Sequence, residues 1–347
     1  MTRFFVRSFV MPIGVLALAA CSFQRASVTP QVEQNVRSTV RDDVPTIEVS
    51  RADRKLARSA HRGRVHIFYN SLNRDQSEEQ RRLAPDVTRY PGDMKYYGGP
   101  VMKSAKAYDL YVTTPSLPQC KTEKCWGNPE EFLQGLTGSP IAGLLKQYTG
   151  ASADAYRYGS SLHIVDEDEL DNVFYDNDIY VVLAAAYHKL KSHGYNTIYH
   201  IFLPPGSDTC FSFTQTCYSP ERESTNLFCA YHSFVEFGSK LQIVYSVEPY
   251  QNYSEKVRGK EVRPCGVPRT PSGTNQLDNA MAASLGHESF EAFTDPGYPL
   301  GWYNATIPSE VADECETFYA VQPFSTGKWF WQLIYSNKIH GCSDNSP

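Results

Sequence analysis

The chain reads SLGHESFEAFTDP over residues 284–296, and this stretch decides how the rest of the sequence is interpreted. His287 and Glu291 are four positions apart, so a helix places them one above the other on the same face. Glu288 then points about 100° away around the helix, within reach of a water on an ion held by the other two residues. The spacing therefore predicts a metal-binding helix with a further carboxylate beside the metal.

Helix signals surround the motif on both sides. Residues 277–293 have a helix-forming composition, and the polar residues 272–275 before them are suitable N-caps. Pro296 and Gly297 end the pattern. The arrangement has the geometry of the His-Glu-x-x-His zinc peptidase helix, with Glu291 in the place of the second histidine.

The glutamate in place of a histidine changes the metal preference of the site. Imidazole and carboxylate both bind zinc, at about 2.0–2.2 Å. A second carboxylate makes the site harder and more negative, which brings calcium and manganese into consideration. We therefore expect Zn²⁺ as the cofactor, with Ca²⁺ or Mn²⁺ as the alternatives.

A catalytic zinc also needs a third protein ligand and an open position for water. The segment SEVADEC at residues 309–315 supplies two candidates, Glu310 and Asp313. Either can be the third ligand, and the other can hydrogen-bond a ligand from behind, as metal-bound histidine usually requires.

Three blocks of this region carry a resemblance to a known family. They are HExxEAxTDP at 287–296, Trp302-Tyr303, and ExxDxC at 310–315. Together they resemble the EXORDIUM-like (phosphate-induced protein) family and its bacterial zincin-like relatives. Shorter matching blocks are YGGPV at 97–101, IFLP at 201–204 and FCAYHS at 228–233.

The resemblance implies a zincin-like fold and a metal-dependent hydrolase site. It assigns His287 and Glu291 as metal ligands and Glu288 as the base. It assigns Glu310 and Asp313 as the third ligand and its support. By analogy to zincins, a peptide bond is the expected substrate.

The N-terminus has the features of an export signal. Arg3 and Arg7 precede the uncharged, mostly apolar run 9–20, which is shorter than the roughly 20 residues that span a bilayer. The run closes on LAAC at 18–21, which resembles the bacterial lipobox. This resemblance implies lipid attachment at Cys21, export to the cell envelope, and the outer membrane if the source is Gram-negative.

The rest of the chain divides at a change in composition. Residues 22–62 are polar with little apolar periodicity, and we expect them to form a flexible tether. Residues 63–347 are expected to form a single zincin-like α+β domain, with a mixed sheet and an active-site helix that carries HExxE. The expected strands lie at 65–69, 107–112, 196–203 and 240–247. The expected helices lie at 128–150, in two short pieces, and at 177–192.

Eight cysteines remain besides Cys21, an even number that predicts disulfides in an oxidising compartment. The two closest spacings favour the pairs Cys120–Cys125 and Cys210–Cys217. The pairs Cys229–Cys265 and Cys315–Cys342 then remain.

Three further residues near these motifs have two interpretations. His232 is expected to be a hydrogen-bonded structural histidine beside Cys229, with an extra metal ligand or an oxyanion donor as the alternative. His200, in a predicted strand, is expected in the core. Tyr303 is expected to pack, with oxyanion stabilisation as the alternative.

Two classes of function follow from these features. The first is a surface-tethered zinc peptidase-like hydrolase of envelope or extracellular macromolecules, in which the metal activates a water and Glu288 takes its proton. The second is a non-catalytic envelope lipoprotein that binds glycan or protein and uses the metal structurally, if at all. The net charge of −5 is spread without long blocks of like charge, so no nucleic-acid partner is expected.

Overall fold

A seven-stranded sheet forms the centre of the computed structural model, with the strand order β1-β5-β4-β7-β11-β10-β2. The structure describes residues 44–69, 92–117, 120, 122–167, 172–211, 216–220, 227–251, 253–257 and 260–345. The strands span Thr46–Glu48 (β1), Tyr156–Val165 (β5), Ala105–Thr113 (β4), Thr197–Phe202 (β7), Leu241–Glu248 (β11), Phe228–Phe237 (β10) and Ala60–Tyr69 (β2). Neighbours from β1 to β11 run parallel, whereas β10 and β2 pair antiparallel. The expected mixture of helices and strands around a mixed sheet is confirmed.

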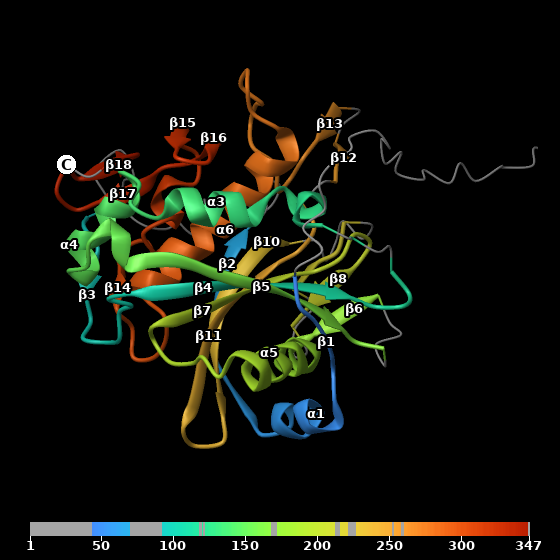
Figure 1. Ribbon diagram of the computed structural model, residues 1–347. Helices are drawn as coiled ribbons and strands as arrows, with labels where there is room; N and C mark the ends of the chain where they lie inside the picture. The colour runs from blue at the N-terminus through green and yellow to red at the C-terminus, as the bar shows by residue number, and fades with distance from the viewer. Residues whose placement is uncertain are drawn as a thin grey trace, which may run out of the picture. The chain divides into compact units, whose positions relative to one another are not determined.

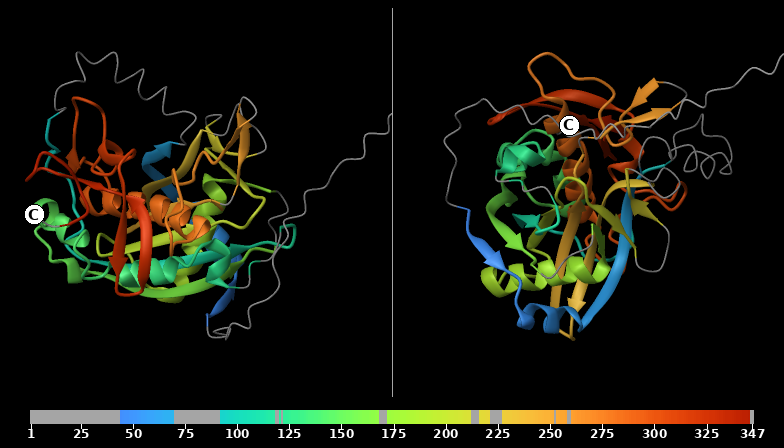
Figure 2. Two further views of the ribbon diagram at one scale, coloured as in Figure 1. Left: turned by 90° about the horizontal axis from the view of Figure 1, so that it is seen from above. Right: turned by 90° about the vertical axis from the view of Figure 1, so that its right-hand side faces the viewer.

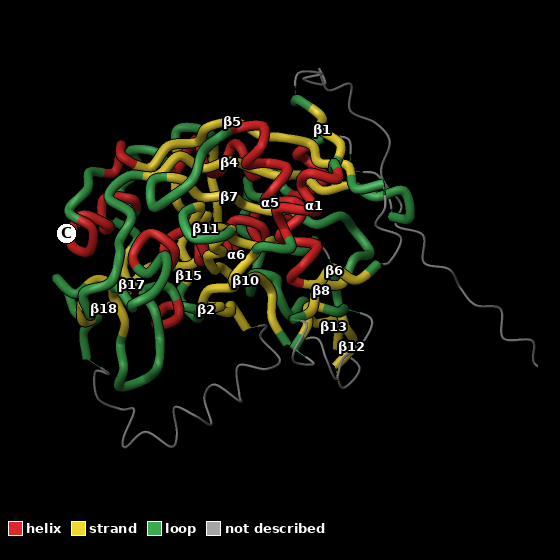
Figure 3. The backbone as a smooth tube through the Cα atoms, turned by 90° about the horizontal axis from the view of Figure 1, so that it is seen from below, coloured by secondary structure: helices red, strands yellow, loops and turns green. Residues whose placement is uncertain are grey.

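Helices cover both faces of the sheet (Figure 1). On one face, α6 (Gln276–Thr294) packs on β10 and β11, and α3 (Pro129–Leu136) packs on β5. On the other face, α5 (Asp176–Leu190) lies against β4 and β5 and carries α1 (Arg51–Ala57) (Figure 3).

Side chains along β4 alternate between the two layers, as the period of a strand requires. Ala107 and Tyr111 enter the core under α6 and α3. Tyr108 and Leu110 enter the core under α5. The sheet therefore separates two hydrophobic cores, and each side chain on it belongs to one or the other.

Shorter helices and strands complete the described structure. They are β3 (Lys95–Tyr96), η1 (Glu123–Trp126), η2 (Ala142–Leu145), α4 (Lys146–Thr149), η3 (Ala153–Ala155), β6 (Val173–Tyr175), β8 (Asp208–Cys210), β9 (Cys217–Tyr218), β12 (Glu255–Val257), β13 (Lys260–Val262), β14 (Trp302–Tyr303), η4 (Asp313–Cys315), β15 (Tyr319–Phe324), β16 (Gly327–Gln332), β17 (Ile334–Ser336) and β18 (Gly341–Ser343). The strands and helices predicted between residues 65 and 293 all appear among these elements, with shifted ends.

Helix α6 is the predicted motif helix, and it is buried on all sides. It begins after Asn275, whose side chain accepts hydrogen bonds from the backbone of Leu277 and Asp278, and it ends just before Pro296. One side faces the sheet, and the β15–β16 hairpin packs against another (Figure 2). Every residue from Asn279 to Thr294 is buried, so the polar residues of the motif lie in the interior rather than on a solvated face.

The close approach of the hairpin to α6 depends on Gly286. A Cβ atom at this position would lie 2.2 Å from Cζ3 of Trp331, a fully buried ring on β16. Glycine costs about 1 kcal/mol relative to alanine inside a helix, so the lack of a side chain here serves packing.

The segment before residue 63 is part of the folded body, which corrects the expected extent of the tether. Residues 46–62 form β1, α1 and the start of β2 instead of a flexible linker. Asp53 closes a capping box with Ser50 and contacts His188 on α5, and Arg54 pairs with Asp166. The sequence pattern missed this because α1 is short and anchored by polar contacts. The signal at 1–21 and the tether before residue 44 lie outside the described residues.

Four disulfides link the cysteines in the favoured arrangement. The pairs are Cys120–Cys125, Cys210–Cys217, Cys229–Cys265 and Cys315–Cys342, with Cα–Cα distances between 4.2 and 5.7 Å. The predicted pairing by spacing is therefore confirmed. Within the described part of the chain, no helix combines the length and the apolar character needed to cross a membrane.

We predict that Gly286→Ala lowers the free energy of unfolding by about 1–3 kcal/mol, because the added methyl overpacks against Trp331. The measurement is urea unfolding of the wild type and the variant. In a Trp331→Phe background the ring atoms nearest the methyl are absent, so the cost of Gly286→Ala should shrink. An equal cost in both backgrounds would show that the contact with Trp331 does not set the requirement for glycine.

Candidate metal centre

Helix α6 places the two predicted motif ligands next to each other. His287 Nε2 lies 3.1 Å from Glu291 Oε1, one helical turn away. Both side chains and that of Glu288 are buried from solvent. His287 is held in orientation from both sides: Phe68 stacks on its ring, and its Nδ1 lies 3.2 Å from Gln332 Oε1.

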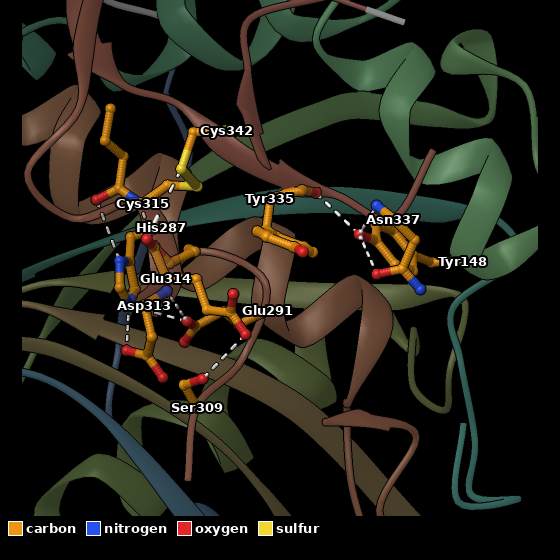
Figure 4. The surroundings of a disulfide bond; sticks show 12 residues. Tyr148, His287, Glu291, Ser309, Asp313, Glu314, Cys315, Tyr335, Asn337 and Cys342 are labelled. Carbon is orange, nitrogen blue, oxygen red and sulfur yellow. Dashed lines mark hydrogen bonds and ion pairs between the residues drawn. A yellow bond between two sulfur atoms is a disulfide. The ribbon is translucent and has the colours of Figure 1, made fainter. Parts of the chain in front are cut away.

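Asp313, at the start of η4, completes a three-residue group with His287 and Glu291 (Figure 4). Its Oδ1 lies 3.6 Å from His287 Nε2, and its backbone N–H donates to Glu291 Oε1 at 3.1 Å. Its side chain is 22% exposed, so this group reaches solvent at Asp313. One ligand atom from each of the three residues lies within 4.8 Å of the others.

Glu310, the other candidate third ligand, points toward two histidines on the sheet. Its Oε2 contacts His66 Nδ1, and its Oε1 lies 3.9 Å from His232 Nε2. His66 on β2 and His232 on β10 are register partners, and their rings stack with centroids 4.6 Å apart. The predicted residues Glu310 and Asp313 thus both lie beside α6, on different sides of the motif.

His232 is the residue that links the two sides. It is buried and hydrogen-bonded, as expected, but its partner is Glu288 of the motif: Nδ1 lies 2.8 Å from Glu288 Oε2. The same nitrogen lies 3.7 Å from Glu291 Oε2. The alternation of β10 explains this, because Tyr231 faces the core under α5 and His232 therefore faces α6.

Sequence reasoning did not identify His66. The stretch 65–69 was recognisable as a strand, but no local pattern marked His66 as a functional residue. His66 comes to lie in this cluster because β2 pairs with β10, a contact between distant parts of the chain. The available signal was a polar residue, His66, between two apolar neighbours, Val65 and Ile67, on a predicted strand.

Several buried polar atoms of this cluster have no hydrogen-bond partner among the described residues. They are His66 Nε2, His232 Nε2, His287 Nε2, Glu288 Oε1 and Glu310 Oε1. Leaving a buried polar group unsatisfied costs about 1–3 kcal/mol, and such groups in a folded protein call for an ion, a water or a catalytic role. Imidazole nitrogens and carboxylate oxygens that converge in this way fit a divalent cation.

Burial and mutual repulsion also raise the pKa values of the carboxyl groups. Burial raises the pKa of Glu288 and Glu310 well above its ordinary range, and the neighbouring acids add to the effect. Burial, with Asp313 nearby, raises the pKa of Glu291 to about 7. Burial alone would lower the pKa of His287, but Glu291 and Asp313 raise it well above its ordinary value. A cation bound here would therefore displace protons.

The pKa values of the two sheet histidines are shifted downward. Burial lowers the pKa of His66 to about 3, and the positive charge of the nearby Arg64 adds to this effect. Burial and the neighbouring His66 and His287 lower the pKa of His232 well below its ordinary value. Both imidazoles are consequently neutral at physiological pH, which is the form that binds metals.

A row of polar side chains crosses the sheet toward this cluster, on the face covered by α6 and α3. Its neighbouring members are register partners on adjacent strands: Ser161, Asp109, His200, Ser246, His232 and His66. His200 Nδ1 and Ser246 Oγ are 2.8 Å apart, and Ser246 donates to Glu248 Oε1 at 2.8 Å. His200 is fully buried, which confirms its expected place in the core.

Comparisons with protein-family models, with curated proteins and with solved structures each found no match for this chain. The resemblance to the EXORDIUM-like family and the zincin-like fold consequently stay predictions. The contacts described above are the grounds for the functional proposal.

We predict that Glu248→Gln changes how stability depends on pH. Burial raises the pKa of Glu248 to about 7 from 4.5, although hydrogen bonds from Ser246 and Ser284 oppose the shift. The folded state therefore retains a proton that the unfolded state has lost, so the free energy of unfolding falls as pH rises from about 4.5 to about 7. By the pKa difference the fall is at most about 3 kcal/mol.

The variant lacks this titration, so its stability should decline less than that of the wild type across the same pH range. Denaturant unfolding at a series of pH values measures the difference. Glu131→Gln, an exposed change on α3, is the matched control and should follow the wild-type curve. Parallel curves for Glu248→Gln and the wild type would contradict the assignment.

Proposed function

We propose that this protein is a metal-dependent hydrolase, of the peptidase type, that is exported and lipid-anchored at Cys21. The observation that carries the proposal is the convergence of His287, Glu291 and Asp313, with Glu288 adjacent on the same helix. Envelope or extracellular macromolecules are the proposed substrates, because the signal features would place the chain outside the cytoplasm and the four disulfides suit an oxidising space.

The donor set favours zinc as the cofactor. One imidazole with two carboxylates suits zinc, and manganese next, whereas calcium prefers oxygen ligands alone. His287, Glu291 and Asp313 would hold the ion, and Gln332 orients His287 from behind. When bound, such an ion polarises a carbonyl and acidifies a water.

Glu288 is placed to move the proton in this chemistry. His232 holds its Oε2, which fixes the orientation of the carboxylate, and its Oε1 has no hydrogen-bond partner among the described residues. A carboxylate in this position can accept a proton from a water on the ion. It would accept a proton from the attacking water and pass it to the leaving group.

Tyr303 and Arg64 lie on the side of the cluster that contains Glu310 and Asp313. The Arg64 guanidinium is over the Tyr303 ring, 5.2 Å from its centroid. Burial raises the pKa of Tyr303, so the phenol keeps its proton and can donate a hydrogen bond to a developing oxyanion. This would be the oxyanion role that the sequence offered for Tyr303 as the alternative to packing.

One observation favours a second candidate function, a non-catalytic envelope lipoprotein with a structural metal. His287, Glu288 and Glu291 are each at most 1% exposed, and structural metal sites are closed. In this alternative Glu288 only supports His232. Glycan or protein binding would then survive the loss of the Glu288 carboxylate.

We predict that Glu288→Gln keeps the metal at α6 but lowers peptide hydrolysis by about 10²–10⁴-fold, because only the proton acceptor is lost. Glu291→Ala should lose that metal together with the activity. The measurements are metal analysis of the purified protein and cleavage of a fluorogenic peptide library.

Glu236→Gln, an exposed change on β10, is the control and should retain both properties. Hydrolysis that persists in Glu288→Gln would contradict the assigned base. The structural alternative would be supported by a wild type that binds zinc and cleaves no peptide of the library. In that case the wild type and Glu288→Gln should also bind glycan or protein equally well.

A further inference from the structure

We propose that His66, His232 and Glu310 form a second divalent-cation site, so that the cluster beneath α6 is a two-metal centre. The proposal rests on the metal centre proposed above and adds residues to it. The two groups, His66–His232–Glu310 and His287–Glu291–Asp313, share no residue, and each brings its ligand atoms within 4.8 Å of one another.

The second group has buried donor atoms without partners. Within the described residues, His232 Nε2 and Glu310 Oε1, which lie 3.9 Å apart, make no hydrogen bond. His66 contacts the same carboxylate through Nδ1, and the three side chains are only 6%, 1% and 2% exposed. Buried polar atoms are normally satisfied, so two that face each other here indicate a ligand.

The backbone holds the two histidines of this group rigidly. They are register partners on β2 and β10, and their rings stack with an interplanar angle of 15°. Sites built on strands are more precise than sites built on loops, because packing locks the side chains.

His232 also has the supporting contact that metal-bound histidines have. A ligating imidazole almost always gives its other N–H to a carboxylate or a carbonyl, which fixes its tautomer. Here Nδ1 meets Glu288 Oε2 at 2.8 Å, and Nε2 is the nitrogen that faces Glu310. His287 repeats the pattern with Gln332, so His232 and His287 each have one nitrogen held by a polar side chain and the other turned toward a carboxylate of its group.

Glu291 lies between the two groups. Its Oε1 is 3.1 Å from His287 Nε2, and its Oε2 is 3.7 Å from His232 Nδ1. His232 Nδ1 is the nitrogen held by Glu288, so Glu291 belongs to the His287 group and stands next to the second group.

The four carboxyl groups of the cluster can accommodate more than one divalent ion. Glu288, Glu291, Glu310 and Asp313 are four carboxyl groups, and the first three are fully buried. Buried charges must be paired or coordinate metals, and one divalent ion balances only two carboxylates. A second ion would balance the other two in their ionised form.

The test is metal stoichiometry of the full-length protein after loading with Zn²⁺ and removal of free metal. We predict two zinc ions per chain in the wild type and one in His66→Ala. His61→Ala is the matched control, because His61 lies on the same strand and is exposed, and it should keep two ions. Electron paramagnetic resonance of the Mn²⁺-loaded wild type should show a spin-coupled pair, which needs no variant to interpret.

The outcomes separate this inference from the proposed function. One ion per chain in the wild type, retained in His66→Ala and lost in His287→Ala, would overturn the second site and leave the α6 centre intact. An uncoupled Mn²⁺ spectrum from the wild type would also overturn the second site. A wild type that binds no ion would overturn both.

Discussion

The burial of three carboxyl groups and three imidazoles on and around one helix is the constraint on which this structure depends. An acidic motif on a solvated helix would need no compensation, but the sheet and the β15–β16 hairpin enclose α6. Desolvation then raises the pKa of Glu288, Glu291 and Glu310, and repulsion between the acids raises it further. Protons can relieve this charge in part, and divalent cations can relieve it completely. The metal proposal therefore follows from electrostatics as well as from the motif.

The architecture brings the proposed ligands together from three parts of the fold. The helix contributes His287 and Glu291, the antiparallel edge of the sheet contributes His66 and His232, and the segment after α6 contributes Glu310 and Asp313. This last segment has no long helix or strand of its own, and the disulfide from Cys315 to Cys342 ties it down two residues after Asp313. A covalent link thus holds the segment of Asp313, the proposed ligand that reaches solvent, where regular secondary structure is short.

Local patterns in the sequence were sufficient for part of this arrangement. The four-residue spacing of His287 and Glu291 and the N-cap at Asn275 predicted α6, because helix periodicity and capping are local. Cysteine spacing led to the correct disulfides for the same reason. The choice between Glu310 and Asp313 stayed open, since it depends on how a loop folds back on the helix. The structure places Asp313 beside His287 and Glu310 beside the sheet histidines.

Long-range pairing explains what the sequence did not show. The positions of His66 and His232 in the cluster come from the register of β2 against β10 and from the face of the sheet that α6 covers. A single sequence contains no signal for a register between distant strands. The docking of α1 was missed in the same way, because Asp53 and Arg54 are anchored by His188 and Asp166 far along the chain.

Anomalous diffraction at the zinc edge, from crystals of the full-length protein grown with zinc, tests the central claim most directly. The account predicts an anomalous peak about 2.0–2.2 Å from His287 Nε2 and from a carboxylate oxygen of Glu291. Zinc-grown crystals without a peak between His287, Glu291 and Asp313, and with the His287–Glu291 contact unchanged, would contradict it.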